Sequence, residues 1–90
     1  MVVLRFRWID WNLEHIAQHG VTPTEAEWVI RHPARGYPRK CRGGYIVCGR
    51  TQDGRWLQVA FARDRSGPGP CAFVYHARPL TPTEKGRMIR

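Results

Sequence analysis

The sequence predicts an α+β domain, an antiparallel sheet of about four strands with helices packed on it. Strands are indicated by short runs of alternating apolar residues, two of which flank an Asp-Gly pair that is typical of a hairpin. Helices are indicated by the segment Thr-Pro-Thr-Glu, which occurs twice and is a helix start signal each time. The expected order is β-α-α-β-β-β-α. Ninety residues suffice for one small domain, which we take to span residues 1–90.

The first strand and the first helix are expected within the first twenty residues. The strand is Val2–Trp8, where apolar residues alternate loosely with arginines. Asp10 is expected to cap a helix from about Trp11 to His19, and Gly20 suits the left-handed position after its last turn. On a helical wheel the expected core stripe of this helix is Ile9, Leu13, Ile16 and Ala17.

The second helix has the strongest start signal in the chain. Thr22 is the expected N-cap, Pro23 takes the first helical position, and Glu25 completes a capping box. The helix is expected to end near His32, because Pro33 disfavours helical geometry in the residue before it. Trp28 falls off the apolar stripe, which favours packing on a loop over a partner surface.

Two strands, Tyr45–Thr51 and Arg55–Arg63, are expected to form a hairpin around the Asp53-Gly54 pair. A two-residue turn would place Gln52 opposite Arg55. In that register one face of the hairpin carries Ile46, Cys48, Arg50, Leu57, Val59 and Phe61.

The remaining segments are two loops, a strand and a helix. Residues 34–44 are predicted to form a basic loop, and residues 64–70 a flexible loop rich in Gly and Pro. Between the second loop and the C-terminal segment, Cys71–Arg78 is expected to be the last strand. The final helix begins at Thr81, with Glu84 completing a second capping box.

The chain is strongly basic, with a formal net charge of +8 and thirteen Arg among its fifteen Lys and Arg residues. Arg binds phosphate bidentately and stacks on bases, so the composition favours a nucleic acid or an acidic protein as partner. A GC-rich coding sequence would give the same Arg content without any function. Only seven residues are Asp or Glu, which disfavours magnesium-dependent nuclease chemistry, and we expect neither a metal nor another cofactor.

Composition also bears on the cellular compartment. No apolar run approaches the ~20 residues of a membrane span, and the segment MVVLRFRW is too short and too charged for a signal peptide. Cys41, Cys48 and Cys71 are odd in number and lack the spacing of a disulfide framework or a zinc knuckle. We therefore expect a cytoplasmic protein without membrane contact.

His15 and His19 are four residues apart and so lie on one side of the first helix, beside its core stripe. Zinc would need a third ligand, and the Glu of the His-Glu-x-x-His pattern is absent, so acid/base work or phosphate contact is favoured over metal binding. Alternatively the pair are polar boundary residues, with His19 interacting with the helix dipole. His76 and Arg78 have the same parity on the last strand and project to one side.

Three segments resemble the BrnT family of type II toxins, and they occur in the family's order: FRWIDWNLEHIAQHGVTPTEAEWVI, GRTQDGRWLQVAFA and YHARPLTPTEKGR. The family pattern runs Trp-Asp, Asn, His-Gly-Val and Glu-Glu-Ala, then Gly-Arg-Thr and Asp-Gly-Arg, then Ala-Arg and Glu-Arg. The matching positions are Asp10, His19, Gly20, Gly49, Arg50, Asp53, Gly54, Arg55, Ala77, Arg78 and Glu84. The family more often has Asn where this chain has His15.

The resemblance implies a RelE-like fold and a ribonuclease that inhibits translation. It also implies a small cognate antitoxin, of the ribbon-helix-helix type, and a toxin–antitoxin hetero-oligomer or a dimer. Cleavage would need no metal, because the 2′-hydroxyl of the RNA attacks the phosphorus. His19 and His15 would act as acid and base or contact phosphate. Arg50 and Arg78 would stabilise the phosphorane, and Glu84 would orient an Arg or act as base. Further RNA contacts are expected from Arg39, Lys40, Arg42, Arg63 and His76.

Two other functions are compatible with the same sequence. The chain could be a non-catalytic module that binds RNA or DNA through its basic surface and counterion release. It could also be a protein-interaction domain in which the face of Trp28 or Trp56 docks an acidic partner. Fragments of RNA formed in EDTA would distinguish the ribonuclease from both alternatives.

Overall fold

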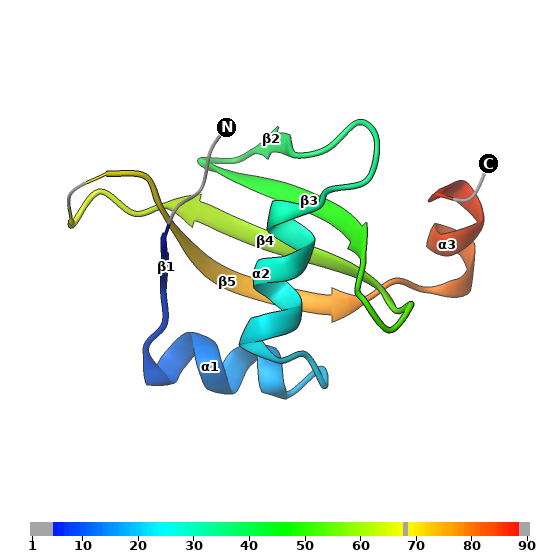
Figure 1. The fold of residues 1–90 in the computed structure, drawn as a ribbon, viewed down its shortest axis with the longest axis horizontal. Coiled ribbons are helices and arrows are strands. Elements are labelled where there is room, and N and C mark those ends of the chain that lie inside the picture. Colours follow the sequence, from blue (N-terminus) through cyan, green and yellow to red (C-terminus); the bar gives the residue numbers. More distant parts are fainter. Residues whose placement is uncertain (1–4, 68, 89–90) are drawn as a thin grey trace.

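The computed structural model describes residues 5–67 and 69–88. Its elements are β1 (Arg5–Arg7), α1 (Asp10–Ala17), α2 (Pro23–Arg31), β2 (Arg39–Cys41), β3 (Gly44–Arg50), β4 (Trp56–Arg63), β5 (Cys71–Pro79) and α3 (Pro82–Met88). The strands form one sheet; α2 lies across it, α1 runs beside β5, and α3 extends beyond the sheet (Figure 1). The α+β class is as predicted. The start of the predicted first strand, residues 2–4, and the end of the predicted last helix, residues 89–90, lie outside the described residues.

The sheet differs from the prediction in strand number and direction. It has five strands in the order β1-β5-β4-β3-β2, and it is mixed rather than antiparallel. β1 runs parallel to β5, with Arg5 opposite Cys71 and Arg7 opposite Phe73, while the other neighbours are antiparallel. Parallel neighbours need a long crossover connection, and here most of the chain supplies it. None of the helices in the described ranges is long and apolar enough to span a membrane.

The additional strand, β2, lies in the segment predicted to be a basic loop. It forms a hairpin with the start of β3, in which Cys41 lies opposite Gly44. The two turn residues, Arg42 and Gly43, have φ values of 38° and 80°. Two consecutive positive φ angles are typical of a type I′ turn, which usually contains Asn-Gly or Asp-Gly. Arg is rarely found in this conformation, so no local signal in the sequence predicts the hairpin.

The hairpin of β3 and β4 has the predicted strands in a register shifted by one residue. The strand pairing ends at Arg50, which lies opposite Trp56, instead of continuing to Gln52 as predicted. The Thr51 N–H donates to the Arg55 carbonyl (2.8 Å) and the Arg55 N–H donates to the Thr51 hydroxyl (2.9 Å). These bonds close a three-residue loop instead of the predicted two-residue turn. Because side chains alternate along a strand, the shift separates Ile46, Cys48 and Arg50 from the face that carries Leu57, Val59 and Phe61.

The core lies between α2 and one face of the sheet. Ala26, Val29 and Ile30 of α2 are buried, as predicted. The helix approaches β3 closely at Gly49, where a Cβ would lie 3.1 Å from both the His32 carbonyl oxygen and a Val29 methyl group. The sheet contributes the buried residues Val47, Leu57, Val59, Phe61, Val74 and Ala77. Residues that alternate with these, including Cys48 and Arg78, belong to the opposite face.

The predicted core stripe of α1 is wrong for three of its four residues. Asn12 and Ile16 are completely buried. The exposed residues of the predicted stripe are Ile9 (40%), Leu13 (36%) and Ala17. A wheel that ranks residues by hydrophobicity places a polar amide such as Asn12 outside the core, whereas this helix turns it inward.

Hydrogen bonds of Asn12 explain this orientation. Its Nδ2 donates to the carbonyls of Arg7 (3.0 Å) and Val74 (2.9 Å), where β1 separates from β5 and backbone groups lose their strand partners. Its Oδ1 accepts the Ile9 N–H (2.7 Å) at the start of the helix. Asp10 is therefore not the N-cap that was predicted; it is the first helical residue, and Ile9 occupies the cap position.

The predicted starts of α2 and α3 are confirmed. Thr22 and Glu25 form a capping box, with bonds of 3.2 Å and 3.0 Å between side chain and backbone. Thr81 and Glu84 form the second box, with bonds of 3.2 Å and 2.8 Å. α1 ends at Ala17, two residues before the predicted end at His19; Gly20 still has the predicted positive φ, 70°, and its N–H donates to the Ala17 carbonyl (3.0 Å).

Candidate active site

Three histidines that are distant in the sequence come together beside β5. His15 lies in the last turns of α1, His19 follows that helix, and His76 lies on β5. The ring centroid of His76 is 5.6 Å from that of His15 and 5.2 Å from that of His19, and the two helix-side rings are 6.4 Å apart. We call these three residues the histidine cluster. The structure thus joins the two predicted acid/base residues to a residue that was predicted only to bind RNA.

Asn12 anchors α1 to β5 next to the histidine cluster. It binds the Val74 carbonyl, two residues before His76 on β5, and it lies on α1 about one turn before His15. This bond fixes the position of α1 along β5, so the imidazoles of the helix face that of the strand. Gly20 then ends the helical turn directly after His19, because its positive φ redirects the chain toward α2.

The imidazoles of the histidine cluster have no carboxylate partner among residues 5–67 and 69–88, and their ring contacts there are with one another and with Trp11. Burial, followed by the charges of His19, His15 and Arg78, lowers the pKa of His76. An imidazole with a lowered pKa is neutral at pH 7 and can accept a proton. Within the same ranges, no three His, Cys, Asp or Glu side chains are arranged to hold a metal ion.

Arg78 lies two residues beyond His76 and is held in a fixed plane. Its NH1 and NH2 groups donate to the two carboxylate oxygens of Glu84 at 2.8 Å and 2.9 Å, and NH2 also donates to Gln58 Oε1 at 3.1 Å. Hydrogen bonding from Arg78, then from the Thr81 N–H, lowers the pKa of Glu84 to about 2. A carboxylate of such low pKa is a weak base, and both of its oxygens are bound by Arg78, which favours its predicted role as a group that orients an Arg over its role as a base.

Tyr37 and Cys48 were not assigned to a site from the sequence. They lie in one row across the strands with Gln58 and Arg78, which we call the Arg78 row. Cys48 is opposite Gln58, which in turn is opposite Arg78. The hydrogen bond with Cys48, followed by burial, raises the pKa of Tyr37, and burial raises the pKa of the Cys48 thiol. Both groups are thus protonated at neutral pH, and Cys48 is not a thiolate nucleophile. Tyr37 lies in a loop, where no periodicity could have placed it on the sheet.

The predicted RNA contacts on β2 and the predicted catalytic Arg50 lie elsewhere on the sheet. Lys40 and Arg42 are exposed on the β2–β3 hairpin, at the edge opposite to β1 and β5. Arg39 is on β2 as well, with its guanidinium carbon 4.5 Å from the centroid of the Tyr37 ring. Arg50 is exposed at the end of β3. Lys40, Arg42 and Arg50 thus provide positive charge at other places on the sheet, whereas the charge of Arg39 acts on Tyr37 and Cys48 of the Arg78 row.

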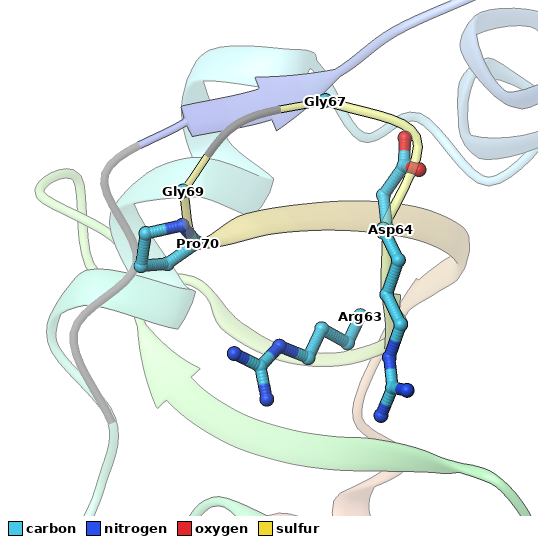
Figure 2. A pocket seen from close by; sticks show the side chains of 6 residues that line it. Arg63, Asp64, Gly67, Gly69 and Pro70 are labelled. Carbon is cyan, nitrogen blue, oxygen red and sulfur yellow. The ribbon is translucent and has the colours of Figure 1, made fainter.

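Arg63 lies at the end of β4 that is remote from Gln58. It lines a hollow of 460 Å³ beside the β4–β5 loop, together with Asp64, Arg65, Gly67, Gly69 and Pro70. Figure 2 shows the Arg63 guanidinium and the Asp64 carboxylate pointing in different directions. Asp64 instead binds Arg7 of β1 (3.3 Å) and the Ser66 hydroxyl (2.6 Å). The hollow is a separate feature from the histidine cluster.

Residues of the Asp-Gly-Arg motif form internal bonds. Arg55 NH1 donates to the Gly20 carbonyl (3.1 Å) and to both carboxylate oxygens of Glu25 (3.1 and 3.3 Å). The Thr51 hydroxyl donates to the Asp53 carboxylate, which lowers the pKa of Asp53. The motif thus ties the β3–β4 turn to the corner between α1 and α2, and its geometry is that of a structural element.

Comparison of the chain with protein-family models and with the curated proteins finds no match.

Proposed function

We propose that the protein is a metal-independent ribonuclease, a cytoplasmic BrnT-like toxin with a RelE-like fold that inhibits translation and is neutralised by a small ribbon-helix-helix antitoxin. The observation that carries this proposal is the convergence of three imidazoles beside Arg78 on β5. The +8 net charge of the chain also favours an RNA substrate.

Cleavage of RNA without a metal needs three groups: a base, an acid and a cation. In this mechanism the 2′-oxygen forms a bond to phosphorus as its proton passes to His76, whose lowered pKa keeps it neutral at pH 7. The bond between phosphorus and the 5′-oxygen then breaks as His19 donates a proton to that oxygen. The products are a 2′,3′-cyclic phosphate and a 5′-hydroxyl. A centroid separation of 5.2 Å lets the two rings flank one phosphate.

Arg78 supplies the cation that stabilises the phosphorane. Its bidentate pair with Glu84 and its bond to Gln58 set the guanidinium plane before substrate binds, so less reorganisation is required in the transition state. His15 borders the same space, 5.6 Å from the His76 centroid, and contacts the phosphate oxygens in this mechanism.

The proposal is tested with purified protein and a single-stranded RNA in EDTA. We expect fragments that end in a 2′,3′-cyclic phosphate, and losses of about 100-fold or more in cleavage rate for His19→Gln and Arg78→Gln. His32→Gln is the matched control, because His32 stacks on Trp28 (3.8 Å) away from the cluster. The proposal fails if His19→Gln and Arg78→Gln cleave like the wild type, or if cleavage stops in EDTA. Salt-dependent binding without cleavage would instead identify a nucleic-acid-binding module.

A second experiment addresses the toxin role. Expression of the chain alone is expected to arrest growth, and His19→Gln is expected to relieve the arrest at equal protein level. Co-expression with a small ribbon-helix-helix protein encoded by the adjacent reading frame should also relieve the growth arrest, and the two proteins should then co-purify. Arrest that persists in both His19→Gln and Arg78→Gln would contradict the assignment of the site.

A further inference from the structure

A row of stacked rings continues the histidine cluster along the outside of α1 and β5. Trp11 stacks on His15, with centroids 5.1 Å apart and planes at 10°, and on Phe73, with centroids 6.2 Å apart and planes at 12°. At the far end, the Arg7 guanidinium carbon lies 5.9 Å from the Phe73 centroid. We call Phe73, Trp11 and His15 the aromatic row. The cleavage chemistry proposed above uses neither Trp11 nor Phe73.

Trp11 is the most exposed of the large apolar residues that the structure describes, at 53%. A Trp side chain stabilises a fold mainly through the apolar area that it buries, so a ring left half in water contributes less to the fold than a buried one. Its ring is nonetheless held in a defined plane by the two neighbouring rings. An ordered, exposed and flat apolar surface of this kind favours the binding of another planar ring.

Positive charge lies at both ends of the aromatic row. Arg7 is at one end, where Asp64 binds it at 3.3 Å, and Arg78 follows the histidine cluster at the other. Planar rings interleaved with basic side chains are typical of surfaces that bind single-stranded nucleic acid, because bases stack on the rings while phosphates meet the charges. In duplex RNA the bases are stacked on each other and their faces cannot reach such a surface.

We propose that the aromatic row binds single-stranded RNA by stacking an unpaired base on Trp11, which sets the strand so that an adjacent phosphate meets the histidine cluster. This inference rests on the proposed function for the identity of the strand as RNA, but stacking itself does not require cleavage. Trp11 is separated from His76 only by the His15 ring, so a base at Trp11 and a phosphate at His76 belong to neighbouring nucleotides. Trp11 is in this sense a positioning residue for the cleavage reaction.

The experiment uses a fluorescein-labelled strand of eight nucleotides with 2′-O-methyl groups, which binds but lacks the attacking hydroxyl. Anisotropy measures its Kd alone and as a duplex with its complement. We expect single-strand binding to weaken about tenfold in Trp11→Ala and much less in Trp11→Phe. The slope of log Kd against log salt should be unchanged in both variants, because the ring carries no charge. Leu13→Ala is the matched control, an exposed apolar residue (36%) on the same helix but outside the row.

Several outcomes overturn the inference: Trp11→Ala binding the strand like the wild type, equal weakening in Leu13→Ala, or equal affinity for strand and duplex. The inference would also be overturned if Trp11→Ala lost binding to an antitoxin but still bound the strand, and the aromatic row would then be a protein interface. A wild type that binds the strand through Trp11 but cleaves no RNA supports the inference while the proposed ribonuclease activity fails. Urea midpoints of Trp11→Ala and Trp11→Phe equal to that of the wild type show that the fold is retained.

Discussion

Polar residues are used in two different ways in two regions near the C-terminal end of α1. At the corner between α1 and α2, the Arg55 guanidinium, the Glu25 carboxylate and the Thr51 hydroxyl all bind groups of the protein itself. In the histidine cluster, by contrast, the imidazoles of His15 and His76 contact other rings but no carboxylate within the described ranges. The first arrangement stabilises a turn, whereas the second keeps nitrogen atoms available for proton transfer.

This difference separates residues that the family resemblance groups together. Arg55 and Arg78 both match the pattern, and both bind a Glu carboxylate through two oxygens. Arg55 binds the Gly20 carbonyl and ties the β3–β4 turn to the corner between α1 and α2, whereas Arg78 follows His76 on the same strand. The predicted resemblance treats the two arginines alike, whereas their positions in the fold differ.

The largest effect is expected from Arg78→Lys. A lysine keeps the charge but cannot form the bidentate pair with Glu84, so we expect RNA cleavage to fall about 100-fold while the urea midpoint stays near that of the wild type. Arg87→Lys, an exposed position on α3, is the control and should retain full activity. Full activity of Arg78→Lys would show that Arg78, like Arg55, has a structural role only.

Asn12→Ala is expected to have the next largest effect, on stability. The substitution removes three hydrogen bonds of a completely buried side chain and leaves the Val74 carbonyl without its donor. Each orphaned buried group costs about 1–3 kcal/mol, so we expect the free energy of unfolding to fall by about 3 kcal/mol in urea titrations. Cleavage per folded molecule should fall too, since α1 loses its position on β5. Gln18→Ala, at an exposed site after α1, should change neither quantity.

Arg55→Ala is expected to cost about 1 kcal/mol of unfolding free energy, because its pair with Glu25 is partly exposed. Cleavage per folded molecule should equal that of the wild type, as measured by initial rates corrected for the folded fraction. If cleavage instead falls as far as in Arg78→Lys at wild-type stability, Arg55 contacts RNA and the contrast between the two regions is wrong.

The smallest effect is expected from protonation of His76. Its pKa is lowered from 6.5 in the folded protein, so the unfolded chain binds more protons just below pH 6.5. The free energy of unfolding should therefore rise with pH through that window, and lose this contribution as pH falls. NMR titration of the ring protons should give a His76 midpoint below 6.5, and His15→Gln should raise it by removing a nearby charge. A midpoint at or above 6.5 contradicts the assignment of His76 as the neutral base.

Local sequence signals predicted those parts of the fold in which the hydrogen-bonded residues are close together in the sequence. The capping boxes at Thr22 and Thr81 each span three residues, so the sequence contains both partners. The register of β3 and β4 depended on the Thr51 hydroxyl, which converts an Asp-Gly turn into a longer loop. The inward face of α1 depended on Asn12, whose partners Arg7 and Val74 become neighbours only in the folded sheet.

The candidate site was predictable to the same extent. Helical spacing places His15 and His19 on one side, and strand parity places His76 with Arg78, but neither pattern says that the helix and the strand meet. That contact follows from the parallel pairing of β1 with β5, which no local motif indicates. Trp11 and Phe73 were missed for the same reason, since each ring gains its partner through this pairing.

The pairing of β1 with β5 also has a consequence for the time at which the site forms. Arg5 lies opposite Cys71, so β1 can join the sheet only after the chain has been made as far as β5. Contacts between residues so distant in sequence close late and slowly during folding. A growing chain that has not yet reached His76 and Arg78 contains neither the cluster nor its cation. For a protein proposed to cut RNA, the order of synthesis thereby delays activity until the chain has been made through Arg78.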